Sequence, residues 1–459
     1  MTQTTTKTSS YQDDFQAVRA NRATHGPAWL TELGDQAWSK FTEIGFPTAR
    51  RGNERWKYTN VAPIAKAKFS LGTEITSQRE PEREAASRAY PWNDDWINLV
   101  FVNGRFSNSL SNLNGFNRAK GGLEVTSLAE VMNSGSGGVE RLLAKHVDFE
   151  EDGFAALNTA FLNDGAFVHI PHGCVLTSPV NLIYLTSASA HPTVSHPRTL
   201  ILVGEGAQAT VIESFVGDRT SEFATEYFTN AVTEIVLAER AILDHYRVIN
   251  EASQAFHVGT SRVILSQDSD FSSSAFATGT ILARNDFEVL LDGPGASCTL
   301  NGLYLTADGQ HMDNLISIDH AQPNTSSQLS YKGILDGKSR AVFGGQVLVR
   351  KNAQKVSAKQ SDKNLLLSNQ AEVDSKPSLL IYADDVQCGH GATAGHVDKD
   401  ALFYLRSRGL DPETASRMLV HAFAREIIET VKVEHLKQYL DDLFLESIPD
   451  TGLQLGGAA

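Results

Sequence analysis

The sequence predicts a mainly β protein, with a β core between two helical regions. Short apolar runs such as "FVHIP", "TVIESFV" and "AVFGGQVLV" recur between about residues 165 and 395, and small polar turns such as "GEGAQA" and "DGPGAS" separate them. No convincing long helix interrupts these runs, which excludes an alternating β–α–β organisation. The recurring turn followed by an alternating strand favours the stacked coils of a β-helix, although a sandwich or barrel of this length remains an alternative.

The composition suits a globular protein of two or three domains, with 459 residues of which 41% are hydrophobic and 20% charged. The formal net charge of -14 argues against a nucleic-acid partner. No apolar run approaches the roughly 20 residues of a membrane-spanning helix, and the first residues lack the apolar stretch of a secretory signal. We therefore expect a cytoplasmic protein that binds neither nucleic acid nor membrane.

Residues 1–150 are expected to form a mostly helical N-terminal domain with one small hairpin. In "GPAWLTELGDQAWSKFTEIGFP" the apolar residues recur three or four apart, with Pro27 near the start and Pro47 just past the end, which predicts a helix. The aromatic residues of "RWKYTN", residues 55–60, are expected to pack rather than to bind a ligand. In "INLVFVNGRFS" the pair Asn103–Gly104 predicts a hairpin turn.

Residues 151–395 are expected to form the β core. Within it, "GQHMDN" and "SIDHAQP" hold His311, Asp313, Asp319 and His320. Polar residues that alternate along a strand are typical of a solvated face, so we expect these four to be solvated rather than catalytic.

Residues 396–459 are expected to form a C-terminal helical domain. "KDALFYLRSRG" places apolar residues on one face and ends at Gly409, a suitable C-cap. In "DPETASRMLVHAFAREIIETV", Asp411 suits the N-cap and Pro412 the first helical position. "EHLKQYLDDLF" predicts one more helix.

The strongest candidate for chemistry is the segment "DDVQCGHGATAG", residues 384–395. The chain has only three cysteines, Cys174, Cys298 and Cys388, too few for a disulfide framework. Cys388 and His390 are two residues apart, so in a strand the thiol and the imidazole point to the same side. Both are good metal ligands, but two are too few for a closed site. The alternative is that Cys388 and His390 form an interior pair with satisfied contacts.

The same segment carries a family resemblance. The stretch "DDVQCGHGATAGHVDKDALFYLRSRGL" and the residues before it, from about 330 to 430, closely resemble the SufB/SufD family of iron–sulfur cluster assembly proteins. Looser similarity extends back to about residue 165. Within this family the chain resembles SufD most, because SufD-like chains carry the Cys-x-His-Gly-Ala-Thr pattern seen at Cys388–Thr393 and an N-terminal "RWKYTN" motif.

This resemblance implies a right-handed parallel β-helix core flanked by helical domains. It implies a scaffold subunit, not an enzyme, that pairs with a SufB-like homologue and binds the ATPase SufC. It also implies a transient iron–sulfur cluster shared with SufB, with Cys388 and His390 as metal ligands and no tightly bound cofactor in the isolated chain. Because a cluster needs about four protein ligands, the remaining ones would come from another chain.

The C-terminal helices of such a subunit would dock the ATPase. Segment 398–430 holds more apolar residues than a small helical pair can bury against itself, which is typical of a partner surface. The alternative is packing onto the end of the chain's own β core. The residues expected to contact the partner are Phe403, Tyr404, Arg406, Arg408, Met418 and Phe423.

Three other readings stay open. A β-helix enzyme acting on acidic polysaccharides would need clustered acidic and basic residues and normally a secretion signal. A purely structural complex subunit would have no role in cluster ligation. A homodimer is also plausible, because the surface that meets SufB could pair with itself.

Overall fold

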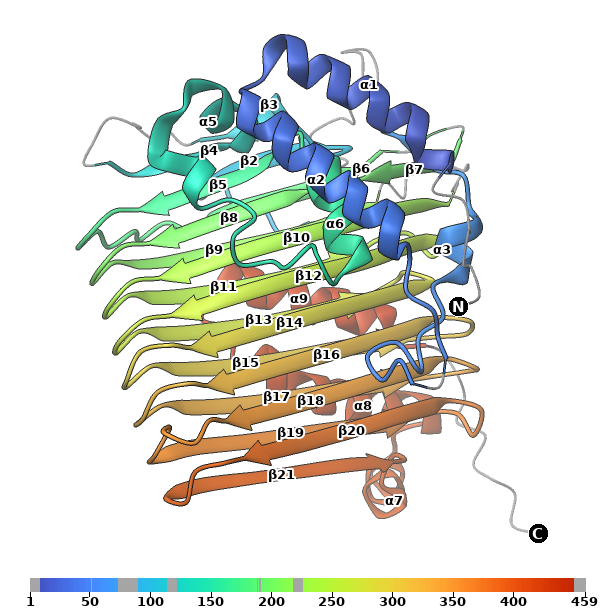
Figure 1. The fold of residues 1–459 in the computed structure, drawn as a ribbon. Helices are drawn as coiled ribbons and strands as arrows, with labels where there is room; N and C mark the ends of the chain where they lie inside the picture. Colours follow the sequence, from blue (N-terminus) through green and yellow to red (C-terminus); the bar gives the residue numbers. More distant parts are fainter. Residues whose placement is uncertain are drawn as a thin grey trace.

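A β-solenoid forms the centre of the molecule (Figure 1). The computed structural model describes residues 9–50, 52–72, 90–113, 122–187, 189, 191–217 and 226–449. Two largely parallel sheets face each other, and the chain alternates between them from β8 to β21. Helices precede and follow the solenoid, so the predicted fold class is confirmed.

The first sheet runs from the antiparallel edge strand β4 to the last strand β20. Its strands are β4 (Glu124–Ser127), β5 (Gly165–Ile170), β8 (Arg198–Val203), β10 (Tyr227–Leu237), β12 (Ala255–Leu265), β14 (Leu282–Leu291), β16 (His311–His320), β18 (Arg340–Val349) and β20 (Glu372–Ile381), with β1 (Ser70–Leu71) and β7 (Thr193–Ser195) alongside β10.

The second sheet runs from the antiparallel edge strand β3 to the last strand β21. Its strands are β3 (Arg105–Asn112), β2 (Ile97–Val102), β6 (Val180–Thr186), β9 (Gln208–Gly217), β11 (Ile242–Asn250), β13 (Asp270–Thr278), β15 (Ser297–Thr306), β17 (Ser326–Leu335), β19 (Val356–Leu366) and β21 (Val386–Gly395). The predicted hairpin is confirmed: β2 and β3 flank Asn103 and Gly104, whose φ angles are 50° and 80°. The boundary at residue 150 stays a prediction, since β2 is hydrogen-bonded into the solenoid through β6.

The turns of the solenoid differ in length from one another, which explains why the repeat is weak in the sequence. Paired neighbours on successive strands are 28 residues apart at His245 and Ser273. They are 34 residues apart at Glu213 and Arg247. The strand alternation nevertheless keeps one face inward, and the inward apolar side chains of both sheets form one continuous core.

The N-terminal helices cover the outer face of the first sheet (Figure 1). They are α1 (Ser9–His25), α2 (Ala28–Ile44), α3 (Ala62–Lys66) and α6 (Gly153–Ala160), with α5 (Leu128–Ser134) and the 3₁₀ helix η1 (Ser136–Arg141) nearby. The helix predicted after Pro27 is confirmed, and Pro27 occupies its N-cap. Apolar residues of α2 and α6 pack with Phe228, Phe256 and Leu282 of the sheet.

The C-terminal helices cover the opposite face, on the second sheet (Figure 1). They are α7 (Lys399–Ser407), α8 (Pro412–Ile428) and α9 (Glu434–Ser447). As predicted, Asp411 caps α8 by accepting a hydrogen bond from the Thr414 amide. Gly409 follows α7 with a φ of 94°, which suits glycine. No helix within the described residues is long and apolar enough to cross a membrane.

The segment around "RWKYTN" lies against the first sheet as a strap. Trp56 is buried, as expected for a packing residue, and the Arg284 guanidinium lies 3.8 Å from its ring centroid. Thr59 donates a hydrogen bond to Asp313. The expectation that Asp313 is solvated is therefore wrong, because the strap covers it. It is also wrong for His320, which points into the solenoid and hydrogen-bonds Thr325 and Ser327.

Candidate functional site

The last turn of the solenoid is open. In the described structure β21 is paired only with β19, and β20 only with β18, so each strand has one unpaired edge. Most residues of β21 are exposed, whereas every residue of β6, near the other end, is buried. Such an edge presents unpaired backbone groups that can bind another strand.

Cys388 and His390 lie on this open strand and share its inner face. Cys388 pairs with Ala358 and His390 with Gln360, both of which are buried inside the solenoid. Cys388 packs against the end of the apolar core, and the two-residue alternation places His390 on the same side. The thiol is half-buried and the imidazole is exposed.

The surroundings of Cys388 disfavour its thiolate, which is the form that binds a metal ion. Burial raises the pKa of the Cys388 thiol, and a backbone hydrogen bond at Ala358 opposes this only in part. The neutral thiol is therefore favoured until a cation approaches. The described contact of the His390 ring is a long one, 3.5 Å from its Nδ1 to Gln360 Nε2.

One turn deeper lies a buried carboxylate that the sequence analysis missed. Asp362 is paired with Ala392 and is 1% exposed. It accepts hydrogen bonds from Ser375 Oγ at 2.6 Å and Asn364 Nδ2 at 2.8 Å. Burial raises its pKa to about 6. The alternation in "VSAKQSDKNLL" could have predicted its burial, because Asp362 lies an even number of residues from the inward-facing Ala358. Polar residues on both faces of this strand make the alternation hard to recognise.

Nowhere in the described ranges do three His, Cys, Asp or Glu side chains gather in a way that could hold a metal ion. Of the other two thiols, Cys298 is buried in β15, where burial raises its pKa, and Cys174 lies near the start of the solenoid against the core. Cys388 and His390 therefore remain a two-ligand candidate.

The predicted partner surface is divided by the structure. Phe403, Tyr404 and Met418 are 71%, 56% and 48% exposed, and Arg406 and Arg408 are also exposed. Phe423 instead packs partly against the second sheet, where the Lys332 ammonium lies 4.2 Å from its ring centroid. The α8 helix thus docks one face on the solenoid and presents the other to solvent.

Fold and site together define a β-solenoid protein with a thiol and an imidazole at an open end. Comparison with known proteins gives the family. A model of the SUF system FeS cluster assembly SufBD core domain matches residues 184–423, and a model of the SufBD protein N-terminal region matches residues 5–182. The chain therefore belongs to the SufBD family of the SUF system, and has a role in iron–sulfur cluster assembly.

Individual relatives agree with this assignment. The chain is 32% identical to the iron–sulfur cluster assembly protein SufD of Escherichia coli, over 88% of this chain and 89% of the relative. It is 32% identical to a SufBD family protein of Synechocystis, over 84% of each chain. The SufD protein of Bacillus subtilis is 24% identical over 90% of this chain and 93% of its own length.

Proposed function

We propose that this chain is the SufD-type subunit of a scaffold complex. It pairs through the open end of its solenoid with a SufB-like homologue, and its C-terminal helices bind a SufC-like ATPase that supplies the ATP hydrolysis. The cargo is a nascent iron–sulfur cluster. The observation that carries the proposal is that Cys388 and His390 lie together on an unpaired strand edge.

The two edges of the open end are not equally suited to pairing. The β20 strand contains Lys376 and Pro377, and both residue types discourage strand addition. The β21 strand contains no proline and no Lys, Arg, Asp or Glu from Val386 to Gly395. A strand of the homologue would therefore add to β21, directly beside the candidate ligands.

Pairing at β21 would complete a site that one chain leaves incomplete. A cluster is held by about four protein ligands, and this chain offers one thiol and one imidazole. Ligands from the homologue would supply the remainder, and iron bound there would stabilise the Cys388 thiolate. A site split between two chains can release its cargo when the interface moves.

The exposed faces of α7 and α8 support the second partner. Phe403, Tyr404 and Met418 are large apolar side chains left in solvent, and Arg408 lies over the Tyr404 ring with its carbon Cζ 5.1 Å from the centroid. Exposed aromatic and arginine side chains are enriched where proteins bind each other. Arg406 and, at the edge of the buried face, Phe423 complete the proposed surface.

The test is coexpression of this chain with its SufB and SufC counterparts, followed by anaerobic purification. We would compare the wild type with Cys388→Ser and His390→Ala, and measure iron, sulfide and visible absorption for each complex. Cys174→Ser is the matched control, since that thiol is also half-buried but lies away from the open end. Loss of the cluster from intact Cys388 and His390 complexes, with the control unchanged, is the expected result.

A normal cluster in both variant complexes would remove the ligand role and leave a purely structural subunit. Size measurement of the chain expressed alone addresses the homodimer. If the β21 edge pairs with itself, the isolated chain would dimerise, and the SufB-like homologue would displace one copy.

A further inference from the structure

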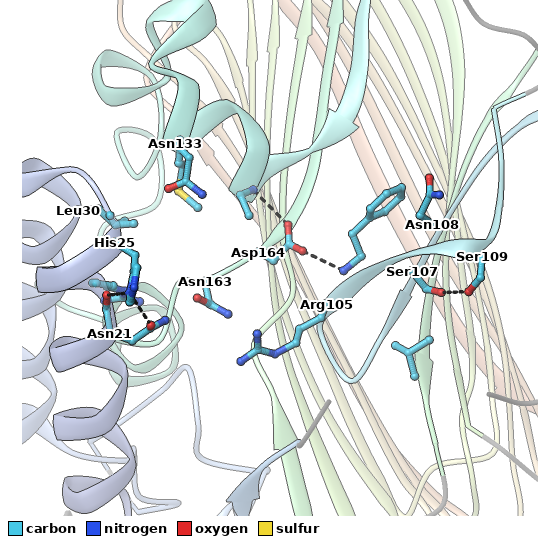
Figure 2. A pocket seen from close by; sticks show the side chains of 16 residues that line it. Asn21, His25, Leu30, Arg105, Ser107, Asn108, Ser109, Asn133, Asn163 and Asp164 are labelled. Atoms are coloured by element: carbon cyan, nitrogen blue, oxygen red, sulfur yellow. Dashed lines mark hydrogen bonds between the residues drawn. The ribbon is translucent and has the colours of Figure 1, made fainter. Parts of the chain in front are cut away.

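A cavity of about 670 Å³ lies far from the open end, among the N-terminal elements (Figure 2). Its walls come from α1, the start of α2, the β2–β3 hairpin, α5 and the segment before β5. Asn21 and His25 lie on the helical wall, and Arg105 reaches from the hairpin toward Asn163 (Figure 2). A volume of this size suits a small organic ligand, for which pockets span roughly 300–1,000 Å³.

Arg22, which lines this cavity, is a buried cation without a carboxylate partner among the described residues. It is 4% exposed, and its two terminal nitrogens donate to the carbonyl oxygens of Ala160 and Leu162. Its Nε has no hydrogen-bond partner in the part of the chain that the structure describes. Burial lowers the pKa of Arg22 to about 10, and the more distant Asp35 offsets this only partly. Desolvating a guanidinium without a counter-charge is costly, so an anion nearby would stabilise it.

The other buried arginines of the described chain show what is missing. Each of the three is hydrogen-bonded to a buried carboxylate: Arg198 to Glu234, Arg247 to Glu213 and Arg284 to Asp313. Among these four, only Arg22 lacks an ion pair with a described carboxylate, and it lines the cavity of about 670 Å³. In the other three cases the chain supplies the counter-charge, whereas no described carboxylate is hydrogen-bonded to Arg22.

The single acidic residue of the described cavity lining cannot fill that role. Asp164 accepts hydrogen bonds from Ser127 Oγ at 2.6 Å and from the amides of Phe106 at 2.9 Å, Ala129 at 3.1 Å and Gly165 at 2.8 Å. These four donors satisfy its oxygens and fix the hairpin and α5 as rigid walls. The remaining polar lining consists of arginine, histidine, asparagine and serine side chains, which donate hydrogen bonds.

We propose that this cavity binds a small multivalent organic anion, a phosphate ester or a polycarboxylate. Arg105 and the asparagines of the wall would contact its oxygens, and Arg22 would supply positive potential from below. The described lining holds two arginines and one carboxylate, Asp164, in a chain of net charge -14, and such a local excess of arginine would attract anions. The cavity does not include Cys388 or His390, so anion binding can be tested independently of cluster assembly.

Isothermal titration of the full-length chain tests this, with pyrophosphate and citrate as separate probes at constant ionic strength. We expect saturable one-to-one binding of at least one probe, and the stronger probe identifies phosphate or carboxylate chemistry. Arg105→Gln should weaken binding at least tenfold, about 1.4 kcal/mol. Asn133→Asp, which keeps the side-chain shape but adds a negative charge to the wall, should have a similar effect.

Arg19→Gln is the matched control, because Arg19 is an exposed arginine on the same helix, paired with Asp35 and outside the cavity lining. It removes the same charge and should leave binding unchanged. Absence of saturable binding by both probes overturns the proposal. So does binding that is equally strong in the wild type, Arg105→Gln and Asn133→Asp.

Discussion

The two ends of the solenoid are built in opposite ways. At the first end each sheet closes with an antiparallel strand, β3 or β4, and helices pack over the outer faces. At the last end β20 and β21 stop the parallel stacking with no strand beyond them in the described chain, and their side chains are mostly exposed. Both ends therefore have edge strands, but the first end reverses to antiparallel pairing, whereas the last end carries Cys388 and His390 on an exposed strand, where we place the proposed pairing.

The same contrast appears inside the solenoid, in two buried carboxylates. Glu213, on β9 and away from the open end, accepts hydrogen bonds from Thr199, Thr233, His245 and Arg247. Burial alone would raise its pKa, but Arg247 and His245 outweigh burial and hold the pKa below its ordinary value. Asp362, one turn from the open end, has no cation partner among the described residues, and burial raises its pKa to about 6. Described cations therefore compensate the charge of Glu213, and none of the described cations compensates that of Asp362.

The largest expected effect is on the free energy of unfolding, when Glu213 is replaced. Glu213→Gln removes the negative charge that pairs with buried Arg247, and breaking such a pair costs about 3–5 kcal/mol. Urea unfolding at pH 7 measures the loss. Because the pKa of Glu213 is lowered, its stabilisation is present above about pH 4.5 and disappears as pH falls further. Lys376→Gln, at the exposed Glu54–Lys376 pair near the open end, should leave the unfolding midpoint unchanged. Equal destabilisation by both variants would contradict the contrast between the two ends.

The next effect concerns pairing at the open edge. Ala392→Lys with Ala394→Lys places two inward-pointing charges on β21, where both alanines are exposed in the isolated chain. We expect binding of the SufB-like homologue to weaken about 100-fold, or 2.7 kcal/mol, with unchanged thermal stability of the isolated chain. Titration by calorimetry or interferometry gives the affinity.

The matched control for that variant is at the other end. Asn108→Lys with Asn112→Lys adds the same charge to β3, the opposite edge strand of the same sheet. Its affinity for the homologue should equal that of the wild type. If the β3 variant instead loses binding and the β21 variant keeps it, the functional end has been assigned to the wrong side of the molecule.

A smaller effect separates the helices from the strand edge. Phe403→Asp removes the most exposed large apolar residue described on α7 and should weaken binding of the SufC-like ATPase about tenfold, or 1.4 kcal/mol. Leu380→Asp, on the exposed edge strand β20, is the control and should leave ATPase affinity unchanged. Should Leu380→Asp weaken ATPase binding as much as Phe403→Asp, the two surfaces would be one.

How far the sequence predicts the molecule depends on the distance between the residues involved. Local signals worked: Asn103–Gly104 gave the hairpin, and Asp411–Pro412 gave the start of α8. The alternation of Cys388 and His390 placed them on one face because strand periodicity is a local property. The β-helix itself was favoured by the recurring turns, while the variable turn length hid its period.

Contacts between distant segments were not predictable in this way. Asp313 was expected in solvent, but the strap around Trp56 and Thr59, more than 250 residues earlier, covers it. Asp362 was missed because its burial depends on which strand of the other sheet faces it. The open end could not be predicted for the same reason, because an edge strand can be recognised only when the order of the strands is known.

The smallest expected effect tests whether Asp362, one turn from the open end, lacks a compensating charge. Because the pKa of Asp362 is raised to about 6, the folded chain holds a proton there that the unfolded chain releases near pH 4, so ionisation destabilises the fold as pH rises through that window. Asp362→Asn removes the charge and keeps an acceptor for Ser375 and Asn364. We expect the variant to match the wild type at pH 4 and to be more stable at pH 8 by about 1 kcal/mol, less than the roughly 3 kcal/mol of a two-unit shift, since Asp362 lies only one turn from the open end. Urea unfolding of both proteins at pH 4, 6 and 8 checks this. A variant that is less stable than the wild type at pH 8 would mean that Asp362 is compensated like Glu213, and the two carboxylates would then not differ in their electrostatics.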